Sequence, residues 1–173
     1  MITQQAQEKV RGWFTGRLPQ EWQVGAPSVT VDREEIVVVL SLEDVQPSPE
    51  AGPEELAEAR VGRAVAFREE TREQRIQIAR EAEHRFDRKV AWGVEIGDHR
   101  ELFTHIAVPV MTRLRQPQRL VLDTLVDAGV ARSRSEALAW CVRLVGRHSD
   151  EWLAELRDAM SHVADVRAKG PAA

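Results

Sequence analysis

The sequence of 173 residues predicts an α+β protein, with an N-terminal region of order αββαββ and a helical C-terminal part. Apolar residues recur at helical spacing near the N-terminus and again after residue 116, whereas residues 29–31 and 36–42 are β-branched runs typical of strands. Hydrophobic residues make up 43% of the chain and charged residues 30%, a composition typical of a protein that buries a core.

The N-terminal elements start with an amphipathic helix from about Thr3 to Gly16, in which four apolar residues share one face: Ala6, Val10, Trp13 and Phe14. The two β-branched runs follow and, with polar residues 32–35 between them, predict a β-hairpin whose second strand is largely buried. Three prolines make residues 46–53 a loop. We expect Trp22 and Trp92 in the hydrophobic core rather than in a ligand pocket.

Residues 54–89 predict one long charged helix, or two helices with a break near Gly62. Arginine and glutamate are closely mixed along residues 68–88, which favours a solvent-exposed face with i,i+4 ion pairs over a nucleic-acid surface. A strand at residues 90–96, a turn at Gly97 and Asp98, and a second extended run at residues 102–114 complete the αββαββ order.

Three helices are expected in the C-terminal part, at residues 116–128, 135–145 and 150–168. The last of them has an apolar stripe that must pack against another surface: Trp152, Leu156, Ala159, Val163 and Val166. We therefore divide the chain into an N-terminal α+β domain of residues 1–104, a segment of residues 105–147, and a C-terminal helix and tail of residues 148–173.

Charge is distributed unevenly along the chain, whose formal net charge is −4. Residues 108–147 contain seven basic and three acidic residues, so their charge is +4, and the rest of the chain carries −8. A basic module on an acidic body offers one surface to phosphate groups.

The connection between the first two C-terminal helices contains two helix-end signals. Gly129 can adopt the left-handed conformation that ends a helix, and Ser133 with Glu136 forms a capping box at the start of the next one. The free N–H groups and the positive dipole end of that second helix then point outward, beside Arg132 and Arg134. Such a helix start is suited to binding an anion.

The stretch from Thr112 through Gly129 to the run Ser133-Arg134-Ser135-Glu136-Ala137-Leu138 resembles the ribbon-helix-helix (Arc/MetJ/CopG-type) DNA-binding family, over residues 108–147. The resemblance implies a homodimer in which a strand at residues 108–114 pairs with the same strand of a second subunit and enters the major groove of double-stranded DNA. It also implies that the second helix of each subunit holds a phosphate with its N-terminus.

The resemblance assigns residues to three roles. The strand would turn Met111 and Arg113 toward the bases. Phosphate contacts would come from Arg115, Arg132, Ser133, Arg134 and Ser135. The dimer core would contain Leu122, Leu125, Leu138, Cys141, Val142 and Val145, with Cys141 a core residue rather than a reactive thiol.

Other chemistry is not indicated. The chain has one cysteine, its five histidines lack metal-ligand spacing, and it contains no glycine-rich phosphate loop, nucleophile elbow or paired-carboxylate signature. We therefore expect no catalytic residue, no metal and no cofactor. The first residues lack the apolar core of a signal peptide and no uncharged run could span a bilayer, so a cytoplasmic protein without a membrane partner is expected.

The sequence thus predicts a homodimeric DNA-binding protein that regulates transcription. The alternative is a non-catalytic interaction adaptor, in which the ribbon-helix-helix segment only dimerises and the acidic N-terminal domain binds another protein. A third possibility is an enzyme or ligand sensor built on the N-terminal domain. The predicted strand offers a single arginine to the bases, too few to specify a long site by itself.

Overall fold

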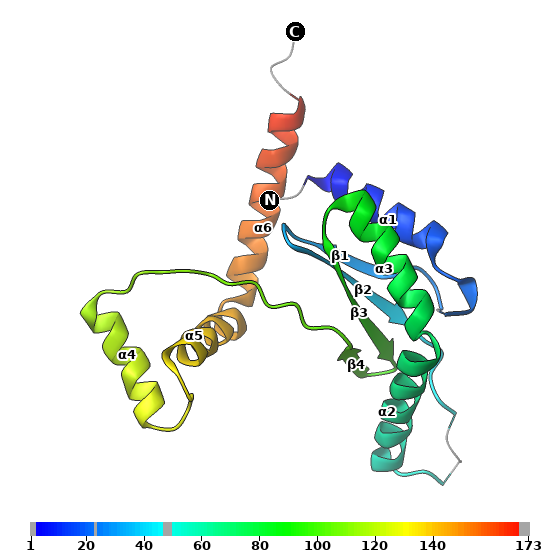
Figure 1. Cartoon of the computed structure of the whole chain (residues 1–173), viewed down its shortest axis with the longest axis horizontal. Coiled ribbons are helices and arrows are strands. Elements are labelled where there is room, and N and C mark those ends of the chain that lie inside the picture. The colour runs from blue at the N-terminus through cyan, green and yellow to red at the C-terminus, as the bar shows by residue number, and fades with distance from the viewer. Residues whose placement is uncertain (1–2, 23, 47–49, 170–173) are drawn as a thin grey trace. The chain divides into compact units, whose positions relative to one another are not determined.

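The computed structural model describes residues 3–22, 24–46 and 50–169 of the chain. The chain divides into two compact units, Met1–Val108 and Pro109–Ala173. The first contains the whole sheet, and the second consists of helices (Figure 1). The predicted α+β class is confirmed.

The sheet of the first unit has four strands in the order in which they occur along the chain: β1 (Ser28–Val31), β2 (Glu35–Ser41), β3 (Lys89–Ile96) and β4 (His99–Leu102). The predicted hairpin is formed by β1 and β2, which are antiparallel, as are β3 and β4. The central pair, β2 and β3, is parallel. Parallel neighbours require a long crossover, and the helices between residues 53 and 86 provide it.

One face of the sheet carries the core of the unit. Ile36 pairs with Val90, Val38 with Trp92 and Leu40 with Val94, so even-numbered side chains of both central strands point to the same side. The helices α1 (Gln4–Arg17), α2 (Pro53–Glu70) and α3 (Arg72–Phe86) contribute apolar side chains to this one core, as Figure 1 shows for α1 and α3 lying over the sheet.

Aromatic contacts join these layers. Phe14 of α1 is fully buried and meets Trp92 of β3 edge to face, with ring centroids 6.0 Å apart. Trp22, in the short helix η1 (Gln20–Trp22), packs against Phe67 of α2 at 5.6 Å. Both tryptophans for which a core position was predicted are therefore core residues.

Two boundaries predicted from the sequence are wrong. The helical break lies at Thr71 rather than near Gly62, because the Thr71 hydroxyl donates to the carbonyl of Phe67 at 2.6 Å and Thr71 leaves the helical conformation, whereas Gly62 lies inside α2. The prediction of one extended run at residues 102–114 is also wrong, because the strand there ends at residue 102. The turn at Gly97, where φ is +58°, starts β4 at once, and β4 ends at Leu102.

The second unit contains α4 (Gln116–Asp127), α5 (Arg134–His148) and α6 (Asp150–Lys169). Leu122, Ala131 and Ala137 form its small buried core, against which a few half-buried residues pack: Leu114, Leu125, Val126, Leu138 and Cys141. Residues 104–115, all of which the structure describes, contain no helix and no strand. A strand requires a neighbour to pair with, and none of the residues that the structure describes pairs with residues 108–114. Pairing with a second copy stays a prediction.

No helix within the described residues is both long enough and apolar enough to cross a membrane.

Candidate nucleic-acid interface

The turn between α4 and α5 fixes the start of α5. Gly129 has φ +74°, and its N–H donates to the carbonyl of Val126 at 3.0 Å, while the N–H of Val130 reaches the carbonyl of Leu125 at 3.0 Å. This is the left-handed helix end predicted from the sequence, in which the last carbonyls of α4 receive hydrogen bonds from the turn. The chain then reverses within six residues, from 128 to 133, and begins α5.

The start of α5 has the serine cap predicted from the sequence, whereas the Glu136 side chain caps Arg132 instead of Ser133. The Ser133 hydroxyl accepts a hydrogen bond from the N–H of Glu136 at 3.2 Å. The Glu136 carboxylate accepts from the backbone N–H of Arg132 at 2.8 Å, one residue before the cap. Ser133, Arg134 and Ser135 are all exposed, so the N-terminus of α5 is accessible to an anion.

Two of the predicted phosphate contacts already have acidic partners. Arg134 donates from Nε and Nη2 to the two carboxylate oxygens of Asp123 in α4, at 2.6 and 2.8 Å. The Arg134 hydrogen bond, followed by its charge, keeps the pKa of Asp123 below its ordinary value. Arg132 pairs with Glu136, with its Nε 3.3 Å from the carboxylate. Asp123 was not predicted as a site residue, although its position on α4 opposite the start of α5 follows from the short turn.

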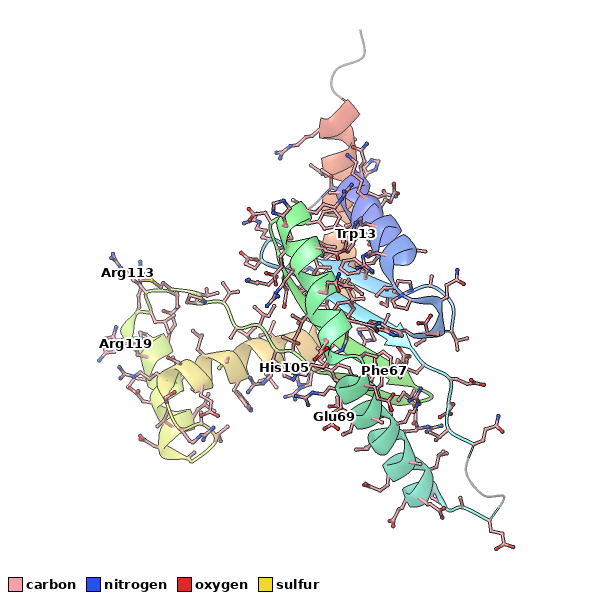
Figure 2. All side chains as sticks on the ribbon, turned by 45° about the vertical axis from the view of Figure 1, so that its right-hand side comes forward. Trp13, Phe67, Glu69, His105, Arg113 and Arg119 are labelled. Carbon is pink, nitrogen blue, oxygen red and sulfur yellow. The ribbon has the colours of Figure 1, made fainter. Side chains whose placement is uncertain are left out.

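The segment before α4 presents the predicted base-reading residues to solvent. Met111 is 96% exposed, and Arg113 is exposed and projects from the chain in Figure 2. Arg115 is exposed as well, and its backbone N–H donates to the Gln118 side chain at 2.8 Å, which satisfies one group at the start of α4.

The predicted dimer core is split between two environments. Leu122 is buried inside the unit, and Leu125, Leu138 and Cys141 are half-buried around it, so these four stabilise the α4–α5 pair within one chain. Val142 and Val145, on α5, are 65% and 53% exposed. Of the six predicted dimer-core residues, only these two keep most of their surface exposed.

The described residues contain no group of three or more His, Cys, Asp or Glu side chains that could hold a metal ion.

The stability of the second unit should fall in acid. Hydrogen bonds from Arg134 lower the pKa of Asp123, and hydrogen bonds from Arg132, the backbone one first, lower that of Glu136. Carboxylates whose pKa is lowered on folding stabilise the protein above their unfolded values near about 4 and lose this effect as the pH falls further. We expect Asp123→Asn to lower the melting temperature at pH 7, with a difference from wild type that shrinks below about pH 4. A difference that stays constant down to pH 3 would contradict this assignment.

Comparison with known proteins identifies relatives of the chain. Residues 8–102 match the family described as Rv1265-like protein, N-terminal domain, and residues 115–167 match the Mb1296 C-terminal domain. The chain is 63% identical over 159 residues to the uncharacterised proteins Rv1265 of Mycobacterium tuberculosis and Mb1296 of Mycobacterium bovis, which covers 92% of this chain and 69% of each relative. No solved structure matches the chain significantly.

Proposed function

This chain belongs to the Rv1265-like protein family, and we propose that it acts as a homodimeric DNA-binding protein that regulates transcription. The observation that carries the proposal is the start of α5, where a serine-capped, exposed helix N-terminus lies beside Arg132 and Arg134. Helix N-termini of this kind bind phosphate through free N–H groups and the helix dipole.

The ion pair of Arg134 leaves room for a phosphate. A guanidinium has five N–H donors, and Arg134 uses only one of them on Nε and one on Nη2 for Asp123. Among the described residues the Nη1 group has no hydrogen-bond partner, so it is available to an incoming oxygen. Asp123 orients the guanidinium of Arg134 and also cancels its positive charge. It should therefore weaken DNA binding while fixing the place at which Arg134 can hold a phosphate.

The exposed apolar surface of the second unit supports a dimer. Among the described residues, twelve of the exposed large apolar side chains lie in this unit and five in the first, although the first is the larger. A concentration of exposed apolar side chains in one unit favours an interaction surface there. A second copy would cover Val142 and Val145 and supply the strand partner that residues 108–114 lack.

Electrophoretic mobility shifts with the full-length protein test the proposal. Wild type is titrated against a pool of random duplexes at several salt concentrations, and bound duplexes are recovered and sequenced. We expect Arg134→Ala to weaken binding and to reduce the slope of log affinity against log salt by about 1, because one phosphate contact is lost. Arg113→Ala should cost about 1–3 kcal/mol and relax the recovered sequence at one position.

Asp123→Asn is the matched variant, with the opposite expected effect on DNA affinity. It removes the competing carboxylate and leaves Arg134 in place, so it should tighten DNA binding and steepen the salt dependence. Arg80→Ala, an exposed arginine of α3 in the first unit, is the neutral control. If wild type binds no duplex, or if Arg80→Ala weakens binding as much as Arg134→Ala, the proposal is wrong.

An interaction adaptor is the second candidate. The apolar character of the segment before α4, where Val110 is 85% and Met111 96% exposed, favours protein over nucleic acid as its contact. The ion pairs of Arg132 and Arg134 with acidic residues also favour a protein contact, because they reduce the positive charge offered to DNA. A dimer in solution that binds no duplex at low salt would select the adaptor.

A further inference from the structure

A cleft of about 480 Å³ lies in the first unit, at the junction of α2, α3 and the chain that leaves β4. Three arginines and one aromatic ring line it: Arg68, Arg72, Arg75 and Phe103. Val65 and Ile76 add apolar surface, and Glu69, labelled in Figure 2, is the one acidic residue of its wall. This volume is in the range of sites that hold small metabolites.

Arg75 is the unusual residue of the cleft because it is a buried cation. Its side chain is on the apolar face of α3 and the residue is 7% exposed. The guanidinium donates to the Thr71 hydroxyl at 2.9 Å and to the carbonyl of Arg68, and it lies 5.1 Å from the centre of the Phe103 ring. These partners are neutral. Buried cations are ordinarily paired with an anion, because desolvation is costly.

The neighbouring charges increase this cost. Burial, followed by the charges of Arg68 and Arg72, lowers the pKa of Arg75. Within the described part of the chain, no carboxylate forms an ion pair with any of these three arginines, although other arginines of α2 do have acid partners. Three arginines therefore line one cleft with a single acidic neighbour, Glu69, for which no ion pair with them is found among the described residues. An anion of more than one charge would relieve this repulsion.

We propose that the cleft binds a small phosphorylated molecule, whose phosphate is held by Arg68 and Arg72 and oriented by the buried Arg75. Phosphate suits the site better than a single carboxylate because it carries up to two charges and offers oxygens to more than one guanidinium fork. The apolar wall of Val65, Ile76 and Phe103 then contacts the rest of the molecule. This site belongs to the first unit and does not depend on DNA binding.

Titration calorimetry of the full-length protein with inorganic pyrophosphate, at constant ionic strength, tests the site. Wild type should bind pyrophosphate. The affinity of the double variant Arg68→Gln/Arg72→Gln should be lower by about 10-fold or more, because two charge-assisted contacts are lost. Both side chains are exposed, so the variant should keep the wild-type circular dichroism spectrum. Arg75 is left unchanged because it also braces the Thr71 break through hydrogen bonds.

Arg80→Gln is the matched control, since Arg80 is an exposed arginine of α3 that does not line the cleft. It should retain wild-type affinity for pyrophosphate. Three outcomes would overturn the proposal: no binding by wild type at millimolar pyrophosphate, an equal loss in Arg80→Gln and in the double variant, or citrate binding as tightly as pyrophosphate. The last result would indicate a carboxylate site.

Discussion

Gly93→Val should unfold or strongly destabilise the first unit. A Cβ added at Gly93 would lie 2.6 Å from the Leu102 side chain and 2.7 Å from the backbone carbonyl of Glu101. The carbonyl cannot retreat without breaking the pairing of β3 with β4, in which Gly93 is opposite Leu102. We expect a loss of about 3 kcal/mol or more, because overpacking against backbone relaxes poorly. Urea unfolding followed by circular dichroism measures it.

Gly62→Ala is the control with the opposite expectation. Gly62 lies inside α2 and a Cβ there meets nothing within 4 Å, so alanine should stabilise the helix by about 0.5–1 kcal/mol. If Gly93→Val unfolds at the wild-type urea concentration, the close approach of β4 to β3 at this point is wrong.

Local signals predicted most of the fold. The helix period, the β-branched runs and the turn at Gly97 and Asp98 placed α1, the hairpin and β3 close to their observed bounds. The parallel pairing of β2 with β3 was not predictable in this way, because it joins residues more than fifty positions apart in the sequence. It also depends on which strand of the hairpin lies beside β3 after the crossover. The end of β4 was missed for a related reason, since the apolar run 106–110 has strand composition but pairs with none of the residues that the structure describes.

The two candidate sites differ in how far the sequence reveals them. The helix end at Gly129 and the cap at Ser133 depend on residues a few positions apart, and both were predicted. The pairing of Arg134 with Asp123 spans two helices and was missed. Arg75 was included in a solvent-exposed charged face, yet its spacing from Ile78 and Ala82, three and seven residues on, places it on the buried stripe of α3.

Val142→Glu combined with Val145→Glu should convert the proposed dimer to monomers. The two valines are three residues apart on α5, so they share a face, and both are largely exposed in the single chain. Glutamates are therefore tolerated by the monomer, but in a twofold interface four carboxylates would be buried near one another without partners. We expect the dimer dissociation constant to rise about 100-fold or more, measured by sedimentation equilibrium against the chain mass of 19.5 kDa.

The same variant distinguishes DNA binding through a two-chain ribbon from nonspecific attraction between arginines and DNA. A ribbon that enters the groove needs a strand from each of two chains, so a monomer should lose DNA binding even though every arginine of the second unit is retained. Val24→Glu, at a valine of the first unit that is 63% exposed, adds negative charge outside the second unit and should leave both the proposed dimer and its DNA affinity unchanged. A double variant that remains dimeric would exclude Val142 and Val145 from the interface. A monomeric one that still binds DNA with wild-type affinity would show that the helix start at Ser133 acts without the ribbon.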